Sequence, residues 1–474
     1  MGMVEEPTTG ANMEITPYDK IISNMKIGVC EMQGWRQTME DAAIVLPNFQ
    51  SNTSLFGILD GHGGSIISEF ISVNFKNVLI KTPSYKKGNY PQALVHVFLI
   101  MDELLKDKDI NNFIYNTHNL KEENKEKKND VQLTRSLSMV KNNKNKIKLR
   151  FETGVYEYDL NKINLKKETE NLTYKLYEYK KPALTPKGEN KNKTISTPDI
   201  NFDEVFFRQS GKQNQALNGL PLFEDVCEIS NQVFNLDKEE NDDINIKKIK
   251  KENTAEVNWD NFIASEMGTT ANIMLIKNGY IYIANVGDSL SVMYKNGKAY
   301  NLNKEHQLII EEEKDRVNKS GANIVGYRIN GMLNLTRALG DLKFKSNQSL
   351  KLYEQSVIAV PEITKIELTN DIDFIIMGCD GVWDCVKRQL VCDFVYQKIK
   401  ENPDKKLSDI LKQIFERCVA TVWGVVIGTD NMSCIVVQFL KEKNNINNNI
   451  ENNIVAQKID FGKETVENIE IEVK

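Results

Sequence analysis

The stretch ANIMLIKNGYIYIANVGDS, residues Ala271–Ser289, decides the fold because it places two apolar strands around one tight turn. The strands ANIMLI and YIYIANV flank Asn278-Gly279, and Asn-Gly is the preferred pair for a two-residue hairpin turn. The pair recurs at Asn296-Gly297 and Asn330-Gly331, again between short apolar runs. Hairpins in succession predict an antiparallel meander and argue against a parallel βαβ sheet.

Working outward, the rest of the chain supplies buried strands and amphipathic helices. Phe374–Gly378 and Ser433–Phe439 have the continuous apolar character of buried strands. Helical periodicity appears in the segments Gly64–Leu79, Gln92–Leu105, Leu308–Asn318, Leu390–Lys400 and Leu407–Val419. An antiparallel pair of sheets covered by helices would bury all of these faces, so we expect an α+β fold.

The composition along the chain predicts one domain over residues 22–440, split by a long insertion. The segment 108–264 is rich in Lys, Asn and Glu and has few periodic apolar runs, which is typical of a low-complexity, solvated loop. Leu220–Phe234 is the exception, because its apolar spacing suits a short amphipathic helix. Residues 441–474 are equally polar, and we expect a flexible C-terminal tail there.

Charge and cysteine content limit the classes of partner and the compartment. The net charge of −5 provides no basic field for nucleic acid or an anionic membrane, so we expect neither as a partner. No apolar run approaches the ~20 residues that a membrane-spanning helix needs. The seven cysteines are odd in number and form no C-x-x-C pair, which favours a reducing compartment, cytoplasmic and/or nuclear.

Acidic residues repeatedly follow the apolar strands. SLFGILD ends at Asp60, YIYIANVGD ends at Asp288, and DIDFIIMGCDGVWD carries Asp380 and Asp384. One such aspartate is more often a helix cap or an Asx turn than a ligand. Several that converge favour a metal site, because clustered carboxylates repel one another unless a cation holds them. With only four histidines and no Cys/His cluster, the oxygen-rich set suits Mg²⁺ or Mn²⁺ better than zinc.

A series of collinear motifs resembles the PPM family of metal-dependent protein phosphatases, also called protein phosphatase type 2C. The matching stretches, in order, are MQGWRQTMED (Met32–Asp41), FGILDGHGG (Phe56–Gly64), GTTA (Gly268–Ala271), ANVGDS (Ala284–Ser289), RINGMLNLTRALGD (Arg328–Asp341), VPEI (Val360–Ile363), CDGVWD (Cys379–Asp384) and GTDNMS (Gly428–Ser433). They cover both compact blocks and none of the insertion. The resemblance implies an αββα sandwich, two antiparallel sheets flanked by helices, with the metals in the cleft between the sheets.

The resemblance also implies the chemistry and the site. It implies hydrolysis of phosphoserine and phosphothreonine in protein substrates by a metal-bridging hydroxide that attacks phosphorus in line, with no phosphoenzyme. We expect the protein to act as a monomer. The implied metal residues, for two Mg²⁺ or Mn²⁺ ions and a weaker third, are Asp60 as the bridge, the Gly61 carbonyl, Asp380 and Asp430, Glu40 and Asp41 through bound waters, and Asp288 and Asp384 at the third site. Arg36 would clamp the substrate phosphate, and His62 would protonate the leaving oxygen.

Some positions depart from the family pattern or suggest structural roles. Leu290 stands where the family commonly has Arg, and Glu305-His306 replaces the usual Asp-His pair; neither change touches an implied ligand. We expect Trp35 and Trp383 to serve packing. The GTTA stretch could cradle a phosphate, although tight packing at a strand entry is the more common role of such small residues.

Within TRALGD, Arg337 and Asp341 suggest an internal ion pair or a hydrogen-bonded turn. Two other functions stay open from sequence alone. One is a catalytically inactive phosphatase fold that acts as a binding module, and the other is a hydrolase of small phosphoesters.

Overall fold

A computed structural model describes residues 10–116, 146–151, 154–163, 172–179, 229–235, 262–423 and 427–441. The chain divides into two units, Met1–Phe439 and Leu440–Lys474. Of the second unit only Leu440 and Lys441 are described, so the predicted tail lies almost wholly outside the described residues.

Two large sheets form the centre of the first unit. The seven-stranded sheet has the order β3 (Ala42–Gln50), β4 (Thr53–Leu59), β11 (Ala271–Lys277), β12 (Tyr280–Val286), β18 (Glu362–Glu367), β8 (Thr173–Tyr179) and β9 (Ile229–Asn235). The six-stranded sheet has the order β1 (Asn12–Ile22), β2 (Met25–Gly34), β20 (Met432–Phe439), β19 (Ile372–Gly378), β13 (Leu290–Lys295) and β14 (Lys298–Asn301). All these neighbours are antiparallel except β8 and β18. Because β1 belongs to the sheet, the folded unit begins upstream of residue 22.

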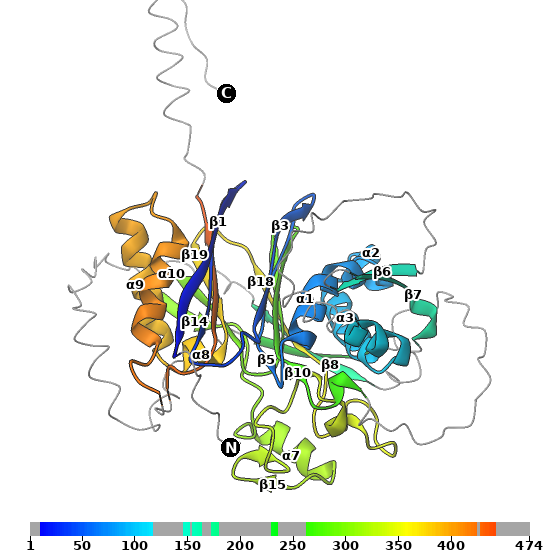
Figure 1. The fold of residues 1–474 in the computed structure, drawn as a ribbon. Coiled ribbons are helices and arrows are strands. Elements are labelled where there is room, and N and C mark those ends of the chain that lie inside the picture. Colours follow the sequence, from blue (N-terminus) through cyan, green and yellow to red (C-terminus); the bar gives the residue numbers. More distant parts are fainter. Residues whose placement is uncertain are drawn as a thin grey trace, which may run out of the picture. The chain divides into compact units, whose positions relative to one another are not determined.

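Helices cover the outer face of each sheet (Figure 1). α1 (Ile66–Leu79) and α3 (Tyr90–Leu105) lie beside the seven-stranded sheet, whereas α9 (Arg388–Glu401) and α10 (Leu407–Cys418) lie beside the six-stranded one. Together with α7 (Glu311–Lys319), these are the five segments whose periodicity predicts helix, with ends that differ by a few residues. The predicted αββα arrangement is therefore confirmed.

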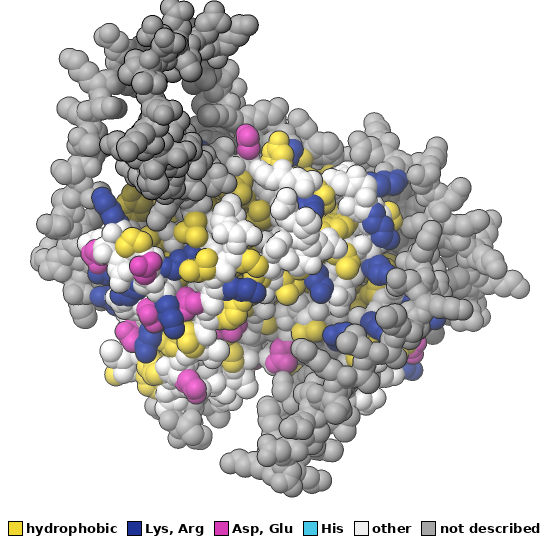
Figure 2. Space-filling view, turned by 90° about the horizontal axis from the view of Figure 1, so that it is seen from above, with side chains coloured by type: hydrophobic (Ala, Val, Ile, Leu, Met, Phe, Trp, Pro, Cys, Tyr) yellow, Lys and Arg dark blue, Asp and Glu magenta, His cyan; other side chains and the backbone are white. Residues whose placement is uncertain are grey.

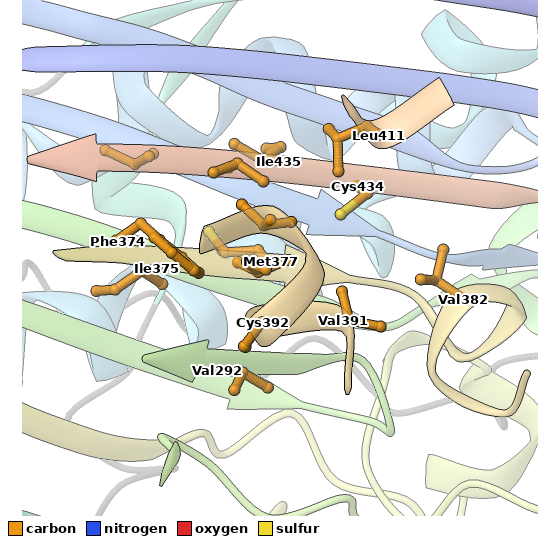
Figure 3. Packing of buried hydrophobic residues seen from close by; sticks show 14 of the residues in the cluster. Val292, Phe374, Ile375, Met377, Val382, Val391, Cys392, Leu411, Cys434 and Ile435 are labelled. Atoms are coloured by element: carbon orange, nitrogen blue, oxygen red, sulfur yellow. The ribbon is translucent and has the colours of Figure 1, made fainter. Parts of the chain in front are cut away.

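In the seven-stranded sheet, β4 and β11 are mainly apolar because both of their faces are buried. In β4, Phe56 and Ile58 belong to the hydrophobic cluster shared with the other sheet. The alternating residues Leu55 and Leu59 belong instead to the cluster under α1 and α3. Period-two alternation thus separates two apolar sets on one strand. Figure 3 shows the other side of the core, where residues of β13, β19 and β20 pack against α8 (Asp380–Trp383), α9 and α10.

Two of the three Asn-Gly turns make sheet hairpins as predicted, but not in one meander. Asn278 and Asn296 have φ of 53° and 52°, and each is followed by a glycine with positive φ. The first hairpin lies in the seven-stranded sheet and the second in the six-stranded sheet. At the third, Asn330-Gly331, only an isolated bridge forms between Ile329 and Leu333. The expected meander is wrong because turn chemistry fixes each hairpin and not the sheet that it joins.

Part of the predicted insertion is folded. β6 (Lys146–Phe151), β7 (Gly154–Asp159), β8 and β9 all lie within residues 108–264. The helix predicted over Leu220–Phe234 is wrong where it is described, since Ile229–Asn235 is a strand paired with β8. A short apolar run does not distinguish helix from strand, and a neighbouring strand edge decided the outcome. Residues 220–228 lie outside the described residues.

The β6–β7 hairpin is joined to the core by a buried asparagine on α1. The Nδ2 atom of Asn74 donates to the Arg150 carbonyl at 2.5 Å, and its Oδ1 accepts from the Arg150 N–H at 2.6 Å. Asn74 is fully buried, and Ile147 and Leu149 of β6 lie in the same cluster as α1. The side chain therefore replaces a sheet partner for β6.

One face of the described surface, drawn in Figure 2, carries both basic and acidic side chains, with hydrophobic ones among them. None of the described helices is long and apolar enough to cross a membrane. Six cysteines fall within the described residues, and all six are free thiols.

Replacing Asn74 should loosen the insertion hairpin. In Asn74→Ala the backbone groups of Arg150 lose both partners, which should cost about 1–3 kcal/mol of stability. Hydrogen exchange followed by mass spectrometry should show faster exchange of the β6 amides. Ser72→Ala, which removes one hydrogen bond to Glu69 on the same helix, is the matched control. Equal protection of β6 in both variants would contradict the proposed attachment.

Candidate metal centre

Strand register brings carboxylates from both sheets to one end of the sandwich. Ala42 pairs with Leu59, which places Asp41 beside Asp60 at the ends of β3 and β4. In the other sheet, β19 and β20 are antiparallel partners. Asp380 follows the first of these strands and Asp430 precedes the second, so both extend from the same end.

A fifth carboxylate sits on the connection between the two sheets. The chain leaves β12 at Val286 and enters β13 at Leu290, so Asp288 lies on the crossover. Gly287 has a φ of 96°, and a Cβ on it would come within 2.6 Å of Thr270, so the crossover needs glycine. Asp288 is 2% exposed and accepts a hydrogen bond from Nε2 of Gln307 at 3.0 Å.

Burial, together with mutual repulsion, raises the pKa values of Asp60 and Asp380. Desolvation, followed by the charges of Asp380, Asp41 and Asp430, raises the pKa of Asp60 well above its usual value. Desolvation and the charges of Asp288 and Asp430 do the same for Asp380, which also shares a hydrogen bond with Asp60. Two carboxyl groups can share a hydrogen bond only when one is protonated. At neutral pH a cation would relieve the same repulsion.

The donor set fits a hard divalent cation. Ligand atoms of Asp41, Asp60 and Cys379 all lie within 4.8 Å of one another. Burial raises the pKa of Asp41 to about 7, and its Oδ2 is buried without a hydrogen-bond partner among the described residues. Burial and the nearby aspartates also raise the pKa of the Cys379 thiol, which keeps it neutral. Oxygen ligands without a thiolate suit Mg²⁺ or Mn²⁺.

Arg36 lies against one of the carboxylates. Its Nη2 atom is 2.6 Å from Oδ2 of Asp430, and both side chains are about one-third exposed, at 38% and 35%. Desolvation would lower the pKa of Arg36, but the charges of Asp430, Glu40 and Asp60 outweigh it and raise the pKa. The predicted phosphate clamp therefore stands at the edge of the carboxylate cluster as a permanent cation.

Asn431, which sequence reasoning missed, holds this edge together. Its Nδ2 donates to the carbonyls of Gln33 and Thr38 at 2.8 and 3.1 Å. Its Oδ1 accepts from the Glu40 N–H at 2.8 Å. The buried amide thus ties the loop that carries Arg36 and Glu40 to the neighbour of Asp430. Its place beside Asp430 in GTDNMS was the only sequence signal.

Gly61 is required by close packing. A Cβ on Gly61 would overlap the carbonyl oxygen of Glu40, and that oxygen also accepts a hydrogen bond from Ser68 at 2.5 Å. Glycine here lets the strand end approach the loop before β3.

Asp384 lies one helical turn after Asp380, and its side chain is exposed. Partial desolvation and the charge of Asp288 raise the pKa of Asp384 to about 6.

His62 pairs with an aspartate from a distant part of the chain. Its Nε2 lies 2.9 Å from Oδ1 and 2.8 Å from Oδ2 of Asp341. Desolvation lowers the pKa of His62, but the charge of Asp341 outweighs it, and the net shift is upward. The expected contact between Arg337 and Asp341 is wrong, because Arg337 donates to Glu313 and to the Val360 carbonyl instead.

Of the two tryptophans expected to serve packing, Trp35 is half-buried, with its ring centroid 6.0 Å from that of Trp423. Trp383 is fully buried and donates to the carbonyls of Leu290 and Gly378. In the GTTA stretch, Thr270 accepts from the Asp60 N–H at 3.1 Å, which braces the strand end instead of forming an open cradle. Of the departures from the family pattern, Glu305 accepts a hydrogen bond from Arg388 at 2.9 Å.

The repulsion predicts how metal and pH act on stability. The folded chain binds the carboxyl protons more tightly than the unfolded chain, so metal-free protein should lose stability as pH rises through about 7, the pKa of Asp41. Mn²⁺ at about 100 times Kd should raise Tm by about 5 °C or more, with a larger gain at higher pH. Differential scanning fluorimetry with Mn²⁺ or chelator measures both effects.

Asp380→Asn should raise the Tm of the metal-free protein and shrink the gain from Mn²⁺, since it removes one repelling charge and one ligand. Asp393→Asn is the control, because Asp393 on α9 accepts a hydrogen bond from Tyr294 on β13 and lies outside the cluster. An unchanged metal gain in Asp380→Asn would remove Asp380 from the centre.

Comparison with known proteins identifies the family of the chain. The family model of protein phosphatase 2C matches residues 25–148 and 187–422. Probable protein phosphatase 2C 21 of Arabidopsis thaliana is 28% identical over 88% of this chain and 87% of its own length. Probable protein phosphatase 2C 11 of Oryza sativa subsp. japonica is 29% identical over 94% and 91%.

Among solved structures, a phosphatase from Toxoplasma gondii aligns with a TM-score of 0.47 and 16% identity, covering 90% of this chain and 95% of that one. The family match takes in well over half of the chain. The chain therefore belongs to the protein phosphatase 2C family.

Proposed function

We propose that the protein hydrolyses phosphoserine and phosphothreonine in protein substrates and depends on Mg²⁺ or Mn²⁺. The observation that carries the proposal is the convergence of Asp41, Asp60, Asp380 and Asp430 from two sheets, with Arg36 bound to the last of them. Membership of a family whose relatives are named as protein phosphatases supports the substrate class.

The carboxylates would hold the metal ions. Asp60, the Gly61 carbonyl, Asp380 and Asp430 would be direct ligands, and Glu40 and Asp41 would orient bound waters. When bound, the cations supply an acidified water and neutralise charge on the phosphoryl oxygens. The chain's own contribution is to hold five acidic groups in place before any substrate arrives.

Arg36 would bind the phosphate of the substrate. One guanidinium nitrogen is committed to Asp430, and the side chain is 38% exposed, so other N–H groups remain for phosphate oxygens. A planar guanidinium suits two phosphate oxygens at once. Attack in line with the departing oxygen needs no covalent phosphoenzyme, because positioning and charge neutralisation provide most of the rate.

His62 would give a proton to the leaving oxygen. A serine or threonine alkoxide leaves poorly unless it is protonated as the bond to phosphorus breaks. His62 follows Asp60 by two residues on β5 (Gly61–His62), and 27% of its side chain is exposed. The ring is therefore accessible to a substrate while Asp341 lies behind it.

The two alternatives fit the site less well. An inactive binding module would have no need for a complete set of repelling carboxylates with Arg36 and His62 beside them. A small phosphoester hydrolase would use the same chemistry, so only a comparison of substrates distinguishes it. Phosphothreonine peptides, phosphoserine peptides and sugar phosphates should be compared at equal concentration.

Release of phosphate from a phosphothreonine peptide should require Mg²⁺ or Mn²⁺. Asp380→Asn should lower kcat about 10²-fold or more while the protein stays folded, because a metal ligand and its charge neutralisation are lost. Asp393→Asn should retain wild-type turnover. Absence of metal-dependent release from the wild-type protein would refute the proposal, and a fully active Asp380→Asn would refute the ligand assignment.

Arg36→Ala should weaken substrate binding more than turnover. Loss of a charge-assisted contact worth about 1.5–3 kcal/mol should raise KM for the peptide about tenfold or more. The assay needs saturating Mn²⁺, since Arg36 also neutralises Asp430. Arg417→Ala on α10, where the guanidinium donates to Gln413, is the control. Unchanged KM in Arg36→Ala would remove the clamp assignment.

A further inference from the structure

A small third sheet brings three separate motifs together behind the metal centre. β5 pairs with β10 (Gly268–Thr269), which pairs in turn with β17 (Leu339–Gly340). In this register Gly268 lies opposite His62 on one side and opposite Gly340 on the other. The motifs that carry His62, GTTA and TRALGD thus occupy adjacent strands.

Gly268 leaves the space through which His62 and Asp341 meet. A Cβ at this position would overlap Oδ2 of Asp341 and come within 2.8 Å of Nε2 of His62. Any larger residue would therefore separate the ring from the carboxylate. Tight packing in GTTA has a specific consequence here, because it permits a contact between residues 279 positions apart.

Asp341 is held rigidly on the far side of the ring. It is 1% exposed, has a φ of 52°, and donates its backbone N–H to the Met267 carbonyl at 3.0 Å. The preceding Gly340 N–H donates to Asp102, whose carboxylate is paired with buried Lys345 at 2.6 Å. The carboxylate therefore faces Nε2 with both oxygens and little freedom to turn.

We propose that Asp341 is a positioning residue for His62 and that Gly268 exists at its position to allow this contact. The inference rests on the proposed function, in which His62 is the proton donor. The two carboxylate oxygens of Asp341 accept a hydrogen bond from the Nε2–H group of His62 and fix the plane of the ring. Nδ1 is then the nitrogen that serves the leaving oxygen.

The step balances without a further reactant. As the bond between phosphorus and the serine or threonine oxygen breaks, its electron pair stays on that oxygen. The oxygen takes the Nδ1 proton and departs as an alcohol. The attacking water forms the new bond to phosphorus and loses one proton to solvent, and solvent later restores the proton on His62.

Leaving-group dependence separates positioning from simple structural support. A phosphothreonine peptide needs the proton, whereas nitrophenolate departs from p-nitrophenyl phosphate without one. Damage to the fold would slow both substrates alike. Asn tolerates positive φ as well as Asp does, so Asp341→Asn changes the charge and spares the backbone.

The experiment compares kcat of the wild-type protein, Asp341→Asn and Asp102→Asn on both substrates with Mn²⁺. Asp341→Asn should lower kcat on the peptide about 10²-fold or more and kcat on p-nitrophenyl phosphate by less than about threefold. Asp102→Asn weakens the contacts of Asp102 with Gly340 and Lys345 but leaves His62 untouched. This variant should therefore lower kcat by the same factor on both substrates. Equal losses in Asp341→Asn, or no loss, would overturn the proposal.

A second measurement needs no turnover. Long-range ¹H–¹⁵N spectra resolve the ring nitrogens of the four histidines, and His62→Gln assigns the signal. The neutral ring should carry its proton on Nε2, and Asp341→Asn should shift this signal. A proton on Nδ1 would overturn the proposal. Wild-type protein inactive on both substrates would refute the proposed function instead, while the spectra still test the pairing.

Discussion

The central constraint of the structure is that the register of the strands holds mutually repelling carboxylates close together. Asp60 and Asp41 come from neighbouring strands of one sheet, and Asp380 and Asp430 from neighbouring strands of the other. None of these positions can move away without breaking a strand register that buries apolar residues on both faces. Burial of the apolar core therefore offsets the electrostatic repulsion within the cluster, and a divalent cation would relieve that repulsion.

Much of the surrounding architecture keeps the strand ends in close approach. Glycines at 61, 268 and 287 stand where a Cβ would meet a neighbouring loop or side chain. Asn431 and Thr270 satisfy backbone groups that the approach would otherwise leave unpaired. The site is thus formed mainly by the close approach of main-chain segments, which side-chain hydrogen bonds then hold in place.

Sequence patterns predicted the elements better than their assembly. Apolar runs around Asn-Gly turns identified the strands that flank Asn278 and Asn296, and acidic strand ends pointed to Asp60 and Asp380 as candidates. They could not reveal that successive hairpins belong to different sheets. The chain crosses between the sheets at Gly287, and which sheet a hairpin joins is decided by tertiary packing. The average composition of the insertion also concealed β6–β9, since a few buried residues such as Leu149 suffice once a docking partner like Asn74 exists. The pairing of His62 with Asp341 left no local signal.

A crystal grown with Mn²⁺ and measured for anomalous scattering tests the central claim most directly. The account predicts strong anomalous peaks within ligand distance of the Asp60 carboxylate, with Asp380 and Asp430 turned toward them. A map without peaks at this cluster, in which Asp60 and Asp380 still share a hydrogen bond, would contradict it.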